Sequence, residues 1–78
     1  MSKVNVKING RDYKVSCDDG EEERLVQLGR TLDDRVKKII AVAGQIGEAR
    51  LLVMVSLMLA DELSDVYSEL EENLTLDV

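Results

Sequence analysis

The sequence predicts an α+β fold of the ββαα type, in which an N-terminal β-hairpin packs on a helix and a long second helix follows. Apolar and polar residues alternate on both sides of an Asn-Gly pair, which is typical of a hairpin. Residues 21–43 place apolar side chains at steps of three and four, which is typical of a helix with one buried face. From residue 48 onwards, a second helical segment is longer than a compact chain of this size can enclose.

The composition limits how stable the chain can be alone. A chain of 78 residues buries only about 60% of the surface that it exposes when unfolded. With 45% hydrophobic residues the sequence is that of a folded chain, but only Tyr13 and Tyr67 are aromatic. Cys17, the single cysteine, has no partner for an internal disulfide. We therefore expect a small domain that gains stability from a second chain.

The charge is distributed unevenly along the chain. Residues 1–50 contain all 10 lysines and arginines against 9 acids, a net +1, whereas residues 51–78 contain 7 acids and no base, a net −7. The overall net charge of −6 disfavours a general nucleic-acid binder, which needs a basic surface to neutralise phosphates. The longest apolar run is about half of the roughly 20 residues that cross a bilayer, and no leader is recognisable. These features lead us to expect a cytoplasmic protein.

The hairpin is predicted from the alternation over residues 4–8 and 13–17. Asn9-Gly10 lies between them and favours a type I′ turn, because both central positions of that turn need a positive φ. A two-residue loop places the apolar residues of both strands on one face, which must then lie on a helix. The expected pairs are Ile8 with Arg11, Lys7 with Asp12, Val6 with Tyr13 and Val4 with Val15.

Five of the six residues from Asp18 to Glu23 are acidic. We interpret them as a helix start, where an Asp at the N-cap accepts a backbone hydrogen bond and glutamates in the first turn favour the helix dipole. The alternative is a cation site. Calcium loops, however, spread their ligands over about a dozen positions with a glycine at a set place, and this segment lacks that spacing.

The first helix is predicted to run from Glu21 to Ala43. Gly29 lies on its apolar face and costs about 1 kcal/mol of helix propensity relative to alanine, so we expect a neighbour to pack closely there. Gly44 is placed to cap the C-terminus. Asp33 and Asp34 are predicted to be solvated on the polar side. The apolar face consists of Leu25, Leu28, Leu32, Val36, Ile39, Ile40 and Ala43.

The second helix is predicted from Glu48 to Leu74, about 40 Å at 1.5 Å per residue. Its first part, residues 51–59, is apolar on all sides and therefore has to be buried on all sides. Farther along, a single apolar row continues at the four-three-four spacing of a coiled coil, which indicates a seam for a second copy. The predicted dimer interface consists of Leu52, Ser56, Leu59, Leu63, Val66, Tyr67, Leu70 and Leu74.

The residues that most enzymes need are missing. The sequence has no histidine, so Cys17 has no imidazole base and no zinc-binding cluster is available. The five glycines form neither a phosphate-binding loop nor a dinucleotide motif. We interpret Cys17 as a small buried residue rather than a reactive thiol. We expect no catalytic activity, no metal and no cofactor.

The order and spacing of several motifs resemble the ZapA family of bacterial cell-division proteins. The first is V-x-V-x-I-N-G-R-x-Y-x-V-x-C, from Val4 to Cys17. It is followed without gaps by further matching positions in both helices, so the resemblance covers nearly the whole chain. These positions are Leu25, Leu32, Arg35, Val36, Leu51, Leu57, Glu62 and Leu63.

The resemblance implies a dimer that pairs through its long helices and binds the tubulin-like division GTPase FtsZ, cross-linking its filaments in the mid-cell ring. It implies no catalytic activity, and a location in the cytoplasm at the division site. Family members carry a longer C-terminal coiled coil that joins two dimers; with the chain ending at Val78 we expect this segment to be short or absent, with a tetramer as the alternative. We expect one structural domain, with a head at residues 1–46 and a dimerisation helix at residues 47–78.

The resemblance also implies that charged residues around the two turns contact FtsZ. Arg11, directly after the turn glycine, matches a family position. Ile40, Gly44 and Ala49 stand where the family has charged residues, so neighbouring charges are taken as substitutes. A structural role for Arg11, shielding Ile8, stays open. The candidate FtsZ contacts are Arg11, Lys37, Lys38, Glu48 and Arg50.

Two other functions remain open from the residues. A dimeric strand-helix-helix DNA-binding regulator would use the outward lysines of the hairpin, Lys3, Lys7 and Lys14, although such regulators use one strand per chain. A coiled-coil partner of another protein would use the acidic second helix to bind a basic one.

Overall fold

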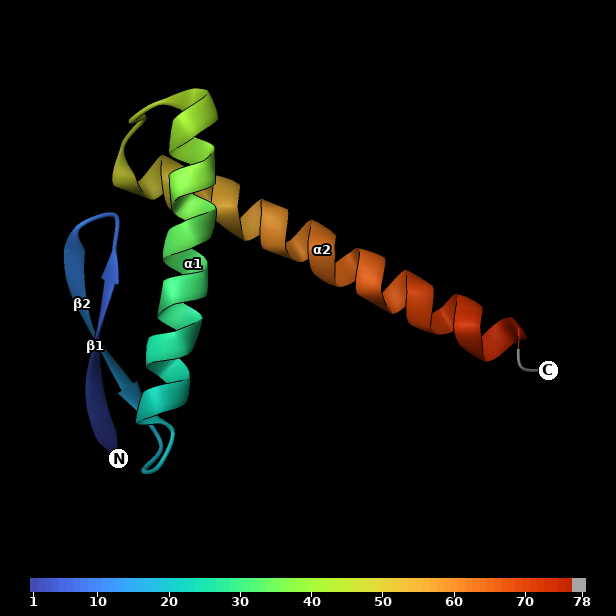
Figure 1. Cartoon of the computed structure of the whole chain (residues 1–78), viewed down its shortest axis with the longest axis horizontal. Coiled ribbons are helices and arrows are strands. Elements are labelled where there is room, and N and C mark those ends of the chain that lie inside the picture. The colour runs from blue at the N-terminus through green and yellow to red at the C-terminus, as the bar shows by residue number, and fades with distance from the viewer. Residues whose placement is uncertain (77–78) are drawn as a thin grey trace.

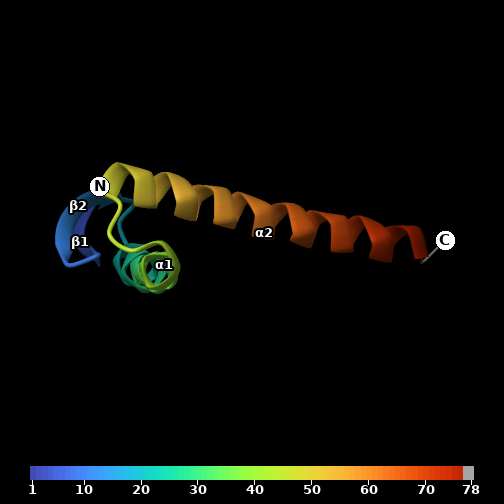
Figure 2. The same ribbon diagram turned by 90° about the horizontal axis from the view of Figure 1, so that it is seen from above.

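The computed structural model describes residues 1–76 and has the predicted ββαα fold (Figure 1). Strands β1 (Ser2–Ile8) and β2 (Arg11–Cys17) form a hairpin alongside helix α1 (Glu22–Ala43), and helix α2 (Glu48–Leu76) follows. Figure 2 shows that the hairpin and α1 lie together at the first turns of α2, whose remaining length extends away from both. Residues 77–78, the end of the predicted dimerisation helix, lie outside the described residues.

The hairpin has the predicted register. Val4 pairs with Val15, and Val6 pairs with Tyr13, so these apolar side chains share one face. Asn9 and Gly10 both have positive φ, at 52° and 79°, which is the requirement of a type I′ turn. The observed pairs confirm the predicted register. The register is well determined because the turn residues and the alternation of the strands both require it.

The predicted Asp N-cap of α1 is wrong. The N-cap residue is Glu21, whose side chain makes no capping hydrogen bond, although Glu22 and Glu23 do lie in the first turn as expected. Asp19 is used elsewhere: its Oδ1 accepts a hydrogen bond from Ser2 Oγ at 2.6 Å and lies 3.3 Å from the terminal amine. The antiparallel pairing brings the start of β1 beside this loop, so Asp19 meets groups that are 17 or more residues away.

Both glycine predictions for α1 are confirmed. A Cβ on Gly29 would lie 3.0 Å from Val6 Cγ1, so the missing side chain lets the hairpin approach the helix closely. Gly44 follows the last residue of α1 with φ at 78°, and its N–H donates to the Ile40 carbonyl at 2.7 Å.

The pKa of Cys17, at the end of β2, is raised by burial and by the carboxylates around it, which disfavours the thiolate.

The core is small and draws on three elements. Ile8 of β1, Val36 of α1 and Leu51 and Val55 of α2 are buried. Leu28, on the predicted apolar face of α1, remains about half exposed. Partly buried side chains surround the core: Val6, Tyr13, Leu32, Ile39, Ile40, Ile46 and Leu52.

Helix α2 begins at the predicted residue and leaves the packed part of the chain after about four turns. Arg35 of α1 forms an ion pair with Glu62, which ties the two helices together at that point. The radius of gyration is 15.9 Å, whereas a compact chain of this length has about 12 Å. The second half of α2 therefore projects from the remainder of the molecule (Figure 1).

Neither helix, over its described residues, is by itself long and apolar enough to cross a membrane. The pair Glu22–Ala43 and Glu48–Leu74, bent by 109° at the break between them, has the length and composition of a broken span when taken together.

Candidate functional site

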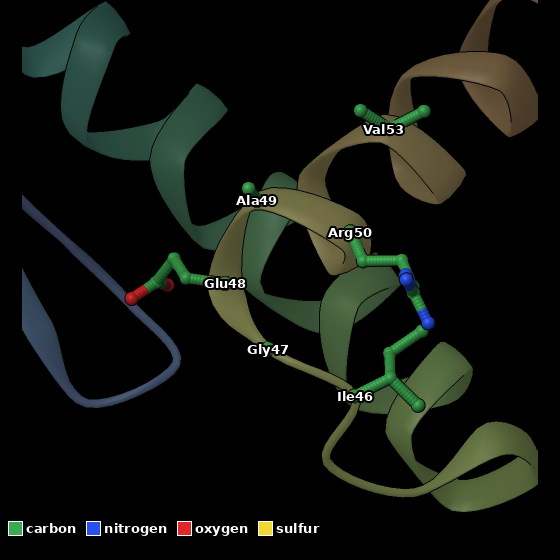
Figure 3. A pocket seen from close by; sticks show the side chains of 6 residues that line it. All are labelled: Ile46, Gly47, Glu48, Ala49, Arg50 and Val53. Atoms are coloured by element: carbon green, nitrogen blue, oxygen red, sulfur yellow. The ribbon is translucent and has the colours of Figure 1, made fainter.

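Two turns of the chain meet beside α1 and bring Arg11 to Glu48. Arg11 follows the hairpin turn, and Glu48 is the first residue of α2. Arg11 Nε lies 2.6 Å from Glu48 Oε2, but the N–H is not aimed well enough for a hydrogen bond, so the contact is an ion pair. In Figure 3 the side chain of Glu48 points toward the hairpin turn. We call this junction of the two turns the corner, defined by Asn9, Arg11, Asp33, Gln45 and Glu48.

A second connection at the corner holds the hairpin turn to α1. The backbone N–H of Asn9 donates to Asp33 Oδ1 at 2.8 Å, and Asn9 Nδ2 donates to Gln45 Oε1 at 3.3 Å. Lys37 Nζ lies 3.2 Å from the other oxygen of Asp33. The Asn9 hydrogen bond lowers the pKa of Asp33, burial opposes this, and Lys37 lowers it further. The prediction that Asp33 is solvated is therefore wrong, whereas Asp34 is exposed.

Tyr13 lies beside the same carboxylate. Burial raises the pKa of Tyr13, and the nearby Glu48 carboxylate raises it further, while Arg11 acts in the opposite direction. Glu48 therefore has a phenol and a guanidinium as neighbours.

The five predicted contact residues do not form one cluster. Arg11 and Glu48 are in contact, and Lys37 joins the corner through Asp33. Lys38 and Arg50 are exposed and form no ion pair within residues 1–76. Figure 3 shows the side chains of Arg50 and Glu48 pointing in different directions. A shallow hollow lies on this side, lined by Ile46, Gly47, Glu48, Ala49, Arg50 and Val53.

The predicted dimer residues, which we call the seam, run along the projecting part of α2. Leu52 is the exception at the packed end, because it is partly buried against the core. Ser56 satisfies its hydroxyl within the helix by donating to the Leu52 carbonyl at 2.7 Å. The remaining seam side chains are exposed: Leu59, Leu63, Val66, Tyr67, Leu70 and Leu74.

Sequence reasoning missed several residues of these surfaces. Val53 and Leu57 are exposed on another side of α2, with Leu57 turned by about 140° from Leu52 at 100° per residue. In the sequence, these two residues belong to the segment 51–59, which is apolar on all sides of the helix. Asn9, Asp33 and Gln45 had no such signal, because their contacts join residues 24 and 36 positions apart.

The structure combines a small packed head, a charged corner and a projecting helix with an exposed apolar row. Within residues 1–76, no group of three or more His, Cys, Asp or Glu side chains is arranged to hold a metal ion. The model of the family "Cell division protein ZapA" matches residues 4–76. The chain therefore belongs to the ZapA family and is a cell-division protein.

Two individual proteins are similar to it. An uncharacterized protein of Rickettsia prowazekii (strain Madrid E) is 29% identical over 73 residues, which cover 94% of this chain and 70% of that protein. A solved structure of an unknown conserved bacterial protein from Pseudomonas aeruginosa PAO1 superposes with a TM-score of 0.82 at 25% identity. That match covers 96% of this chain and 82% of the other, so the ββαα arrangement is shared over nearly its whole length.

Proposed function

We propose that two copies of the chain pair through the seam, and that the paired heads bind and cross-link filaments of the division GTPase FtsZ at the mid-cell ring. The observation that supports this most is the row of exposed apolar side chains on a helix that projects from its own core. Membership of the ZapA family supports a role in cell division. Under this proposal the protein is a non-enzymatic linker that acts in the cytoplasm at the division site.

The exposed apolar side chains of the seam support pairing with a second chain. Six of its side chains, from Leu59 to Leu74, are between about a third and two-thirds exposed in the single chain. Covering half of a Leu or Val side chain contributes on the order of 1 kcal/mol at about 25 cal/mol per Å². Val53 and Leu57 extend the surface toward the head. A coiled-coil-like dimer is the simplest arrangement that covers this row with an identical row.

Pairing also supplies what cross-linking needs, which is two heads in one particle. Once one head has bound a filament, the second binds at a high effective concentration, so the pair can bind about 100-fold more tightly than one head. The heads would contact the filament through charges around the two turns, Arg11, Lys37, Lys38 and Arg50, with Glu48 paired to Arg11.

We do not propose the DNA-binding alternative. It relies on one strand from each chain, whereas β1 and β2 of this protein pair with each other in a single chain. Lys3, Lys7 and Lys14 are exposed on the outward face of this hairpin, but the net charge of the chain is −6.

The test compares Leu70→Asp with Ser68→Asp, which adds the same charge about 160° around the helix from the seam position. Each variant is mixed with FtsZ polymerised with GTP, and bundling is measured by low-speed co-pelleting and light scattering. We expect Leu70→Asp to be monomeric and to bundle nothing, and Ser68→Asp to bundle like the unmodified chain. Bundling by a Leu70→Asp variant that sediments as a monomer would contradict the proposal.

A further inference from the structure

We propose that Glu48 is a positioning residue, which holds the Arg11 guanidinium so that its free edge meets a carboxylate on the partner filament. This inference rests on the proposed function. It also changes the role of Glu48, which the sequence suggested as a contact residue: the structure points to Arg11 as the contact, with Glu48 acting through it.

The two side chains of the pair differ strongly in exposure. The side chain of Glu48 is 19% exposed, whereas that of Arg11 is 71% exposed. A carboxylate that is mostly covered by its own chain offers little surface to a partner. The guanidinium next to it remains accessible, so it is the member of the pair that a partner can reach.

The geometry of arginine leaves donors free after it has paired with Glu48. A guanidinium has five N–H donors in a flat fork, and Glu48 lies at the Nε side. The nitrogens at the far edge can still donate two parallel hydrogen bonds, which is the arrangement that a carboxylate accepts. The chemistry that fits this edge is therefore an Asp or Glu side chain on an acidic protein surface.

The backbone around Arg11 is anchored by two further sets of contacts. Asn9, two residues earlier, donates to Asp33 of α1 and to Gln45 of the loop before α2. Ile8, which pairs with Arg11 across the hairpin, is buried in the core. With the backbone anchored at the turn and the side chain held by Glu48, the guanidinium loses little freedom when a partner binds.

Positioning and simple electrostatics predict opposite results for Glu48→Gln. Removing the negative charge makes the corner more positive, which by charge alone strengthens binding to an acidic partner. Releasing Arg11 makes its side chain mobile, and immobilising it again weakens binding by about three- to tenfold. We expect the second effect to be larger, because the charge of Glu48 is already partly neutralised by Arg11.

The experiment measures FtsZ binding for full-length chains with an intact seam, by co-pelleting at limiting concentrations. Glu48→Gln is compared with Glu23→Gln, which removes the same charge from an exposed position in the first turn of α1, away from the corner. We expect about three- to tenfold weaker binding for Glu48→Gln and no change for Glu23→Gln. Equal or tighter binding by Glu48→Gln would overturn the inference.

A double-mutant cycle separates positioning from a general effect on the fold. In an Arg11→Ala background, Glu48→Gln is expected to have no further effect on binding, because no guanidinium is left to position. An additional loss of the same size in that background would overturn the inference. Since Arg11→Ala leaves Glu48 without its cation, Arg11→Lys serves as a second variant; it keeps the charge without the fork and should also bind more weakly.

The same variants distinguish this inference from the proposed function. If Arg11→Ala and Arg11→Lys bind FtsZ like the unmodified chain, nothing is positioned and the inference fails. Bundling that depends on the seam would still support the proposed function in that case. If the unmodified chain neither binds nor bundles FtsZ, both fail together.

Discussion

The first and second halves of α2 contain the same kinds of residue in opposite environments. Leu51 and Val55 are each 1% exposed and share a core cluster with Ile8 of the hairpin and Val36 of α1. Leu63 and Leu70, only a few turns farther along, are each 54% exposed. No change in helix propensity accounts for this contrast, since leucine forms helices equally well in both places. The difference lies in the neighbours, because the hairpin and α1 cover only the first turns.

If two copies pair as proposed, the two halves of α2 depend on different chains. The buried side of the first half, Leu51 and Val55, is part of a core that one chain completes, so its contribution to stability does not depend on concentration. The second half exposes apolar surface that a second copy would cover, so its contribution should grow with concentration. Substitutions in the two halves should therefore differ in how their effects depend on protein concentration.

The largest effect is expected for Leu51→Ala. Leu51 is the largest of the fully buried side chains, and removing it leaves a cavity that costs about 2–5 kcal/mol. Urea unfolding followed by circular dichroism should show this loss at every protein concentration. Leu70→Ala is the matched control. The free energy of unfolding that this variant loses should become smaller as the protein is diluted. A loss of equal size for both variants at high dilution would contradict the division of α2 into two halves.

A smaller effect is expected for Gly29→Val. The first carbon of the new side chain would lie 3.0 Å from Val6 Cγ1, so the hairpin has to move away from α1. Overpacking of this kind costs about 1–3 kcal/mol. Valine has a better helix propensity than glycine, so a loss at this position comes from packing. Ala41→Val, at an exposed position of the same helix, is the comparison without a close neighbour and should cost about half a kcal/mol. Thermal unfolding of both variants tests this; a Gly29→Val variant as stable as the unmodified chain would show that the close approach is not tight.

The smallest effect is expected for Asp33→Asn, and it depends on pH. The Asn9 hydrogen bond lowers the pKa of Asp33 from its ordinary value of 3.8 in the folded chain. A lowered folded pKa means that ionised Asp33 stabilises the fold above about pH 4, and that this stabilisation disappears as pH falls through the folded pKa. The unmodified chain should therefore be the more stable at pH 6, and the difference should narrow toward pH 2. Urea midpoints that differ equally at both pH values would contradict this.

Much of the fold could be predicted from the sequence because it follows from short-range rules. Asn9-Gly10 and the alternating strands determine the hairpin register, and Gly44 ends α1 where expected. Gly29 was also informative, because a glycine on an apolar helix face usually has a close neighbour. The N-cap failed for the opposite reason, since Asp19 binds Ser2 and the terminal amine, which no local pattern contains.

The two candidate surfaces differ in the same way. The seam residues share one side of a helix, so periodicity alone could find them, and the structure leaves most of them exposed. The corner is assembled from three separate segments, and its carboxylates at Asp33 and Glu48 are bound by residues of the hairpin turn. Sequence spacing could name its charged residues but could not show which of them pair.

The central claim, that a second copy covers the seam, is tested most directly by the mass of the chain in solution. Sedimentation equilibrium of the unmodified chain, Leu63→Asp and Ser68→Asp at micromolar concentrations would measure it. We expect at least twice the chain mass of 8.7 kDa for the unmodified chain and for Ser68→Asp, and 8.7 kDa for a folded Leu63→Asp. A mass of 8.7 kDa for the unmodified chain, or an unchanged assembly of Leu63→Asp, would contradict the account.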